Sequence, residues 1–494
     1  MFKYRAWLLI IFLCCLFQVS RAQFDTQSPY SYYGIGTPVG NSLQNGFAMG
    51  GVSHALRDSC YINYLNPAAY SSLDVTTLIF GFEGNFLTRI DQGQTFRNNN
   101  VFINQFGLGI PIIHKHKFMN WGMFLGYAPY SQVGYRLADS ATVIMNIDTT
   151  SNTADTMLAR YRYTGTGGLN TLTWGNAFQL GKNFSIGFNL HYIFGTSSRI
   201  RTLELPADKG YLSSRVEEKT RVNSFSFDVG MQSFFNFKTK RYTLPRRSVT
   251  PAKKDTLGHI IIPKKVYILP DTMRGPITYK KYQFVIGGTY NFGNSFDAGF
   301  DQLGIQYLAG TFNTNVDTFL LNPTATGNIT MPHAFGGGIA LVNPGIWLLS
   351  ADFNYKLWSG FRYFDQPNLV FTNSFSFHLG TEFTPYFSDK FTGKRRFFKN
   401  ISYRFGVRYY NRFYRPDSKQ VDEYGFSFGF GLPFGFNTSY DPDGNQKIII
   451  SYINLGVEGG LANSRGSSLV NESFVRFSIS VTLRDKWFNK RYYN

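Results

Sequence analysis

The chain has 494 residues, 18% of them aromatic and only 16% charged, and it contains 49 glycines. This composition, without long stretches of Ala, Glu, Leu and Lys, argues against a mainly helical protein. The formal net charge of +19 is of the kind found in nucleic-acid-binding proteins. Much of that excess lies in one segment, residues 238–281, so we do not expect nucleic acid as a partner.

Residues 1–22 have the organisation of a secretory signal peptide. Lys3 and Arg5 supply the positive charge, Ala6–Val19 form the apolar core, and Ser20 and Ala22 are the small residues that the peptidase requires. The apolar run is too short to be read as a spanning helix. We therefore predict an exported protein that loses residues 1–22.

Residues 23–74 precede the first clear strand pattern and contain the stretch GFAMGGVSHALRDSCYINYLNPAAY. Cys60 is the only cysteine left after the signal peptide, so no intrachain disulfide can form, and we expect it to be a small buried residue. Pro67 indicates a turn, and Asn66 before it is restricted to an extended conformation.

From residue 75 onwards, large apolar residues alternate with small or polar ones. In one segment, Phe225, Phe227 and Val229 lie on one face, and Ser226 and Asp228 lie on the other. A period of two indicates β-strands. The pattern predicts fourteen strands, near residues 75–87, 100–112, 117–130, 170–180, 183–195, 220–237, 281–293, 329–341, 346–358, 369–385, 399–410, 423–435, 447–458 and 472–483.

The apolar face of these strands is unusually aromatic, and Tyr and Phe recur at the strand ends, as the interfacial girdles of a membrane barrel require. Lipid cannot satisfy free strand edges, so such a sheet must close. We therefore predict an all-β protein of the bacterial outer membrane. Its residues 75–484 would form a transmembrane antiparallel β-barrel of about 14 strands, with a short N-terminal hatch in the lumen.

An even number of strands places both chain ends, including the tail 485–494, in the periplasm. Short connections between strands then become periplasmic turns. The long connections become extracellular loops, at residues 131–169, 196–219 and 294–328.

One long connection, residues 238–281, falls on the periplasmic side instead. It has twelve Lys and Arg against two Asp and is punctuated by prolines. A charge run of this kind is typical of a solvated loop. It would also suit a docking arm for an acidic periplasmic or envelope partner, and the sequence leaves both interpretations open.

A fourteen-stranded barrel has a lumen too wide for its wall side chains alone to fill, so residues 23–74 are the available hatch, or plug. Lumen-facing charges such as Arg404, Arg408 and Glu458 must be paired when they are buried. They either belong to an ion-pair network that fixes the hatch, or they bind a ligand carboxylate, which the guanidinium fork suits.

We expect no enzymatic activity, no cofactor and no metal. The sequence contains no HExxH motif, no paired Cys and His spacing and no phosphate-binding loop. His378 lies near Ser374 and Ser376 on the same predicted face, but no motif fixes them as a catalytic arrangement.

Several motifs together resemble the FadL and TodX family of outer-membrane transporters for long-chain fatty acids and aromatic hydrocarbons. They are the tripeptide Asn66-Pro67-Ala68, the hatch stretch opened by Gly46, Gly50 and Gly51, the element YAPYS at residues 127–131, and WLLSADFNYKLWSGF at residues 347–361. The hatch is also similar to the PorV-type proteins of type IX secretion in Bacteroidetes, a branch of the same fold that handles secreted protein cargo.

The FadL resemblance implies a passive transporter that releases a hydrophobic small molecule, such as a long-chain fatty acid, sideways into the outer-membrane lipid. Asn66, Pro67 and Ala68 would form the hatch motif, with Asn66 inside the barrel near the kinked third strand. Gly126 and Pro129 would form the kink and lateral gate, because proline cannot donate to a sheet ladder. The PorV resemblance implies the alternative, a scaffold or cargo-handling component of a secretion or envelope-assembly machine.

Overall fold

The structure is a computed structural model. It describes residues 29–40, 43, 45–91, 94–114, 119–148, 153–206, 211–241, 247–250, 253–254, 260–262, 265–268, 278–308, 314–367, 370–385, 398–415, 418–440, 446–464 and 471–487. The predicted signal peptide, 1–22, most of the insertion and the last seven residues of the predicted tail lie outside the described residues.

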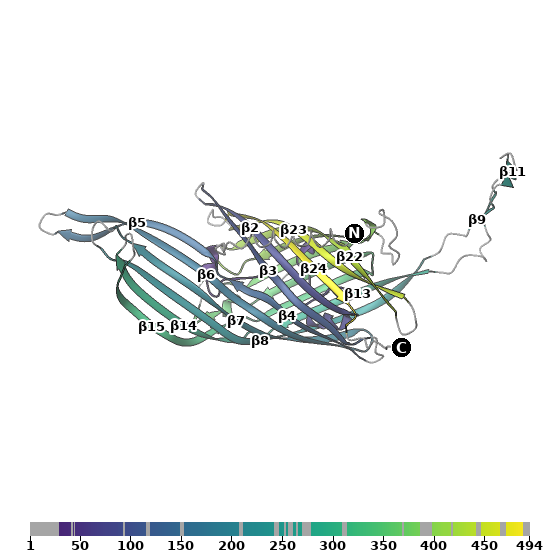
Figure 1. The fold of residues 1–494 in the computed structure, drawn as a ribbon, viewed down its shortest axis with the longest axis horizontal. Helices are drawn as coiled ribbons and strands as arrows, with labels where there is room; N and C mark the ends of the chain where they lie inside the picture. The colour runs from purple at the N-terminus through teal and green to yellow at the C-terminus, as the bar shows by residue number, and fades with distance from the viewer. Residues whose placement is uncertain are drawn as a thin grey trace, which may run out of the picture.

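Within the described residues, fourteen antiparallel strands close into one barrel, as predicted (Figure 1). Closure is made by the pairing of the first ring strand with the last, from Thr76↔Asp485 to Arg89↔Glu472. The ring strands are β2 (Thr76–Asp91), β3 (Gln94–Ile113), β4 (Met119–Gln132), β6 (Thr153–Leu180), β7 (Phe184–Glu204), β8 (Ser213–Arg241), β13 (Thr278–Asn291), β16 (Ala334–Asn343), β17 (Trp347–Lys356), β20 (Ser374–Phe383), β21 (Ser402–Asn411), β22 (Val421–Tyr440), β23 (Gln446–Ser464) and β24 (Asn471–Asp485).

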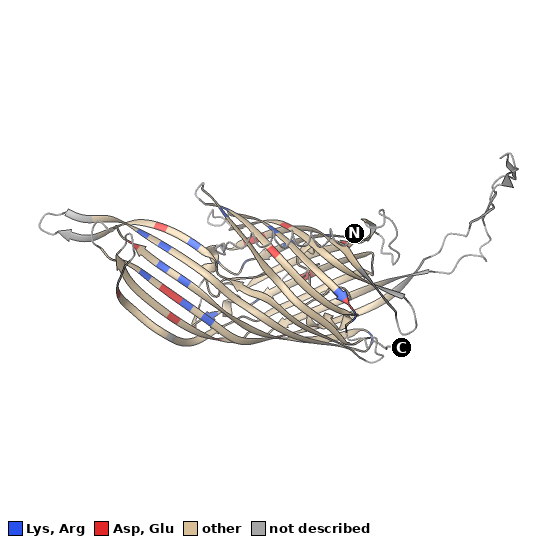
Figure 2. Cartoon of the chain, in the orientation of Figure 1, with Lys and Arg blue, Asp and Glu red and all other residues tan. Residues whose placement is uncertain are grey.

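The period-two pattern of the sequence becomes the two faces of the wall. On β22, Phe426 is 58% exposed on the outside, whereas Ser427 is 1% exposed on the inside. Figure 2 shows that the middle of the wall carries almost no charge, while charged residues gather toward one end. An outward band of large apolar side chains is the surface that a bilayer requires of a barrel.

The wall extends beyond the ring at the end opposite the short turns 181–183 and 344–346, which we call the extended end. There β5 (Tyr135–Asp148) pairs with β6, and β14 (Ser295–Leu308) pairs with β8 and β15 (Thr314–Thr330). The prediction of long loops in these regions is therefore wrong.

The reason for the error is the charge on these strand extensions. Ion pairs link neighbouring strands in water, among them Arg162–Glu204 at 3.1 Å and Arg221–Asp301. The alternation in these strand extensions lacks the large apolar residues of the lipid-facing band, so the sequence pattern there does not indicate strands. Paired opposite charges on one face of a sheet stabilise adjacent strands.

The other elements are short. The described helices are the 3-10 turns η1 (Pro29–Tyr32), η2 (Phe47–Met49), η3 (Pro67–Ser72), η6 (Trp358–Gly360) and η7 (Phe398–Asn400), and none of them is long and apolar enough to cross a membrane. The remaining strands are β1 (Thr37–Pro38), β9 (Arg247–Thr250), β10 (Lys253–Lys254), β11 (Ile260–Ile262), β12 (Lys265–Ile268), β18 (Arg362–Tyr363) and β19 (Gln366–Pro367). Within the insertion, β9 pairs with β12 and β10 pairs with β11.

The extended end makes a testable prediction. Because Arg160, Arg162, Arg201, Lys219 and Arg221 lie on paired strands rather than on loops, trypsin should not cut after them in the folded protein, despite their exposure. Limited digestion of the protein in liposomes, followed by mass spectrometry of the peptides, measures this. The heat-unfolded protein, in which the same bonds should be cut, is the control, and rapid cleavage at Arg160 or Arg162 of the folded protein would contradict the assignment.

Candidate functional site

The hatch, residues 45–74, lies inside the ring and touches both sides of the wall. Its η2 turn packs against β20–β23, and its η3 turn packs against β4, β6, β7 and β8. Glycines allow the backbones to approach closely. Gly50 has a φ of 70°, and a Cβ on Gly287 of the wall would lie 1.9 Å from the His54 carbonyl oxygen.

Asn66 is fully buried within this hatch. Its Oδ1 accepts a hydrogen bond from the Ala68 amide at 3.2 Å and so caps η3, which begins at Pro67. Its Nδ2 donates to the His54 carbonyl at 2.6 Å and to the Met231 carbonyl of β8 at 3.3 Å. Asn66 thus lies inside the barrel and bonds to the wall, but to β8 rather than to the third strand, β4.

Pro129 lies in β4, at an irregularity of the wall. The register between β4 and β6 shifts between Pro129 and Ser131. On the other side of β4, the pairing with β3 runs through Gly107↔Gly126 and ends at Phe106↔Tyr127, although both strands continue. Beyond that point β3 and β4 no longer pair with each other, and we call this gap in the ladder the wall opening.

The N-terminal segment lies at this opening. Its strand β1 pairs with β4 through Thr37↔Gln132 and Pro38↔Ser131. One side-chain hydrogen bond crosses toward β3, from Asn100 Nδ2 to Gln132 Oε1 at 3.3 Å.

The two arginines singled out by sequence have different surroundings. Arg404 is fully buried, and its guanidinium donates to Glu382 at 2.6 Å, to Asn454 at 2.8 Å and to the hatch hydroxyl of Tyr61 at 2.9 Å. All three of its nitrogens are thus engaged, two with side chains of the wall and one with the hatch. Arg408 is also ion-paired, but it lines the internal cavity described below.

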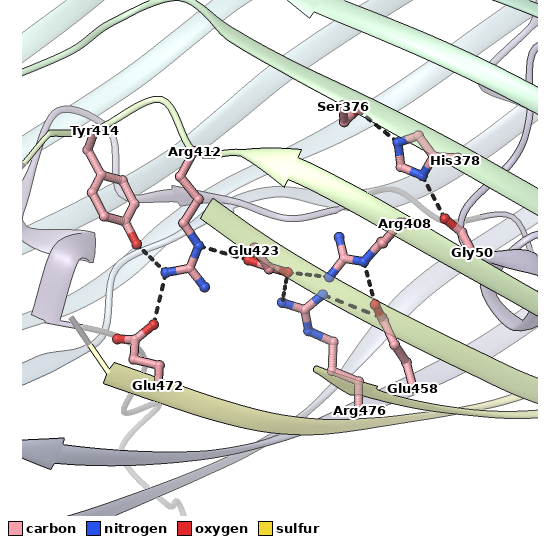
Figure 3. Close-up of polar contacts among 10 residues, drawn as sticks. All are labelled: Gly50, Ser376, His378, Arg408, Arg412, Tyr414, Glu423, Glu458, Glu472 and Arg476. Carbon is pink, nitrogen blue, oxygen red and sulfur yellow. Dashed lines mark hydrogen bonds and ion pairs between the residues drawn. The ribbon is translucent and has the colours of Figure 1, made fainter. Parts of the chain in front are cut away.

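Arg408 belongs to an ion-pair network above the hatch (Figure 3). Glu423 lies at its centre and forms ion pairs with Arg408, with Arg412 at 2.8 Å and with Arg476 at 3.3 Å. The network continues through Glu458 and Glu472, and Glu423 is only 3% exposed. Three guanidinium groups around one buried carboxylate are the pairing that buried charges require.

Only Arg408 and Glu458 of this network were predicted to face the lumen. Arg412 lies just after β21, where the period-two pattern has ended, so no sequence signal placed it inside. The other members come from β22 and β24, and only the closed ring brings them together.

His378 connects this layer to the hatch. Its Nδ1 donates to the Gly50 carbonyl oxygen at 2.6 Å, and its Nε2 accepts from the Ser376 hydroxyl at 2.8 Å (Figure 3). The nitrogen that does not face Ser376, Nδ1, therefore donates to a backbone carbonyl and not to the carboxylate that a catalytic triad requires. Within the described residues the pair is a further anchor of the hatch.

A buried aromatic cluster closes the extended end of the lumen. Trp358 stacks on Phe413 with ring centroids 4.5 Å apart, and Tyr30 of the N-terminal segment stacks on Tyr414 at 4.7 Å. The same cluster reaches across the ring to Ile193 on β7. We call it the aromatic cap.

A cavity of about 230 Å³ remains between the hatch and the aromatic cap. It reaches the wall opening, because Pro38, Asn100 and Gln132 line it. Its opposite side is lined by the ion-pair network, including Glu423 and Arg476. The space is therefore lined by both apolar and polar residues, and the charges of the ion-pair network that line it already have partners.

Comparisons with known proteins agree with this architecture. A family model named BamG matches residues 1–257 and 275–494. The chain belongs to the BamG family. No curated protein matches it in sequence.

Solved structures with a similar fold are channels and transporters. The CymD monoaromatic hydrocarbon channel is 12% identical, with 92% of this chain and 100% of that chain covered and a TM-score of 0.47. The Pseudomonas putida toluene transporter TodX is 13% identical, with 91% and 99% covered and a TM-score of 0.47. A Pseudomonas aeruginosa FadL homologue is 12% identical, with 90% and 99% covered and a TM-score of 0.47.

These structures are of the FadL and TodX type that the sequence resembles, and this BamG-family chain is a closed barrel with the outward apolar band that an outer membrane requires. The similar structures are channels rather than enzymes. The roles assigned by resemblance to Asn66, Gly126, Pro129 and Arg408 stay predictions.

The contacts of Asn66 predict how firmly it holds the hatch. Asn66→Ala removes the cap of η3 and a donor to the buried His54 and Met231 carbonyls, a loss on the order of 1–3 kcal/mol. Burial and the nearby Asp58 raise the pKa of the Cys60 thiol, so Cys60 should react slowly with a maleimide in the closed hatch. The variant should react faster, on the order of tenfold, as the hatch opens more often.

The control for this experiment is Asn85→Ala on β2. The Oδ1 atom of Asn85 is buried and accepts no hydrogen bond in the described part of the chain, so this change takes no hydrogen bond of that oxygen away from the hatch. Equal maleimide rates in wild type and Asn66→Ala, or equal acceleration in both variants, would contradict the anchoring role.

Proposed function

We propose that this barrel is a membrane-embedded scaffold of a secretion or envelope-assembly machine. The observation that carries the proposal is the filling of its lumen. The aromatic cap, the ion-pair network and the hatch form three successive layers across the ring. A barrel whose interior is occupied in this way offers its surfaces, rather than its lumen, to other molecules.

The hatch anchors support the same proposal. Wall side chains from many strands bond to hatch backbone or side-chain atoms. They include Asn189 on β7, Gln232 on β8, Asp352 on β17, His378 on β20, Arg404 on β21 and Arg484 on β24. Displacing the hatch would leave these buried polar groups without partners, each at about 1–3 kcal/mol. Such an interior favours a rigid support.

The basic insertion supplies a surface for a partner. Residues 238–281 carry twelve Lys and Arg against two Asp, and they leave the barrel between β8 and β13 at the end of the short turns. A concentration of one charge sign steers and holds an oppositely charged partner. We assign the partner to the acidic proteins of the periplasm or envelope.

The first test replaces the Lys and Arg residues of 242–277 by Gln and leaves the paired ends of β8 and β13 intact. Tagged wild-type protein, extracted from native membranes in mild detergent, should elute with a partner in fixed proportion, and raised salt should release it. The Gln variant should lose that partner while keeping the heat-modifiable mobility of a folded barrel. A control replaces the same number of Lys and Arg residues on the strands of the extended end. Recovery of the wild-type barrel alone would overturn the proposal.

A second candidate function is passage of a hydrophobic small molecule through the wall. It is favoured by the opening between β3 and β4 and by the cavity that reaches it. The similar solved structures include a toluene transporter and a FadL homologue. An amphipathic molecule could keep its polar group in the cavity beside Arg408 while its tail leaves through the opening.

This candidate predicts measurable binding of a lipid-like probe. Purified barrel should bind radiolabelled oleate or toluene, and Arg408→Met should weaken oleate binding on the order of tenfold while leaving toluene binding unchanged. Arg404→Met is the comparison, since Arg404 is engaged with the hatch and does not line the cavity. No saturable binding of either probe by a folded barrel would exclude transport and leave the scaffold.

A further inference from the structure

One seam of the barrel is left partly open. At the other seams of the described ring, neighbouring strands pair up to the extended end of the shorter strand or within one residue of it. Between β3 and β4 the ladder stops at Phe106↔Tyr127, five residues before the end of β4 at Gln132. Residues 99–105 of β3 therefore pair with β2 on one side only.

This open edge lies at the depth of the lipid. Val101 and Ile103 of β3 point outward with exposed fractions of 52% and 43%, which match the lipid-facing residues of other strands. Leu125 on β4 faces the same way at 44%. In hydrocarbon, each backbone N–H or C=O without a hydrogen-bond partner costs several kcal/mol, so an open edge at this depth needs a cover.

The chain itself pairs only with the opposite edge of the opening, which is the edge of β4. The N-terminal segment bonds along β4, with the Val39 amide donating to the Tyr130 carbonyl at 3.1 Å and the Ser131 hydroxyl donating to the Ile35 carbonyl at 2.8 Å. No ladder pairing joins this segment to β3 among the described residues. Pro129, which has no N–H to donate, lies in the part of β4 beyond Tyr127 that does not pair with β3.

Buried polar groups beside the β3 edge also lack partners. Gln105 is 2% exposed, and neither its Nε2 nor its Oε1 has a hydrogen bond within the described residues. The Oδ1 of Asn104, whose side chain is 5% exposed, likewise accepts no hydrogen bond within the described residues. Both amides lie on the inner face of the wall near Gly81 of β2, within the stretch of β3 that has no ladder to β4.

We propose that residues 99–105 of β3 accept a β-strand from a second outer-membrane protein. The residues at the two edges of the opening determine which side chains that strand must carry. Its outward side chains meet Val101 and Ile103 and must be apolar, and its inward side chains meet the polar cavity and must be small or polar. This alternation is that of a transmembrane β-strand. Strand addition to an exposed edge is an established mode of recognition between proteins.

The inference rests on the scaffold function and names the kind of partner that it holds. The basic insertion and the β3 edge lie at different heights of the barrel, so the two contacts can be tested separately. Strand addition also satisfies the open backbone groups, which a passing hydrocarbon cannot do.

The test places the photo-crosslinker benzoylphenylalanine at Val101 or at Ile103 in the full chain, in living cells. Matched controls carry it at Val475 and Ile479 of β24, which are 49% and 45% exposed but lie between two fully paired neighbours. Ultraviolet light should give a protein adduct from the β3 positions, with a yield roughly tenfold above that of the β24 positions. Mass spectrometry should place the crosslink in a segment with alternating apolar and polar residues.

Several results would overturn the inference. They are adducts with lipid alone, adducts with residues 29–40 of the same chain, adducts with a second copy, and adducts in a loop or helix of the partner. Co-purification of a partner through the basic insertion, without any crosslink at β3, would remove the strand-addition site and leave the scaffold. If neither the co-purified partner nor the crosslink at β3 is found, the scaffold function is contradicted as well.

Discussion

The structure depends on one constraint, that every backbone N–H and C=O at the depth of the lipid must find a partner. That constraint closes the sheet from β2 to β24 and makes each ring strand long enough to cross the bilayer. It also gives meaning to the single seam where pairing stops early. An open seam in water would be ordinary, whereas between Val101 and Leu125 it lies beside apolar, lipid-facing side chains.

Closing fourteen strands creates a second problem, because the lumen is wider than wall side chains can fill. The chain solves it with layers of different chemistry. The hatch fills the short-turn side through hydrogen bonds, the carboxylate of Glu423 gathers three arginines in the middle, and Trp358 and Phe413 close the extended end. The charges of the ion-pair network are paired with one another, and a cavity of about 230 Å³ remains between the hatch and the aromatic cap.

Sequence reasoning found the ring strands because the lipid imposes a strict alternation of large apolar and small residues. It failed where lipid is absent. β5, β14 and β15 are strands in water that keep their pairing with charges such as Arg162 and Glu204, and those charges read as loops. The same limit applies inside, since Arg412 lies beyond the pattern of β21 and meets Glu472 only in the closed ring.

The hatch shows a similar division between what sequence can and cannot specify. Pro67 indicated a turn with an extended Asn66 before it, and the structure has this turn, η3, capped by the Asn66 side chain. The strand that Asn66 bonds to depends on how the hatch is rotated in the lumen. In the structure Asn66 donates to the Met231 carbonyl of β8 and not to β4. Local sequence determines the turn, whereas packing against several strands determines which one it touches.

Pro129 brings the two constraints together. It has no N–H to donate, and it lies in the stretch of β4 beyond Tyr127 that no longer pairs with β3. At the end of this stretch, β4 pairs with β1 instead. A chain that only needed a sealed barrel would gain stability from closing that seam. Keeping it open, beside the unpaired amide of Gln105, is understandable if the edge of β3 has a partner from outside the chain.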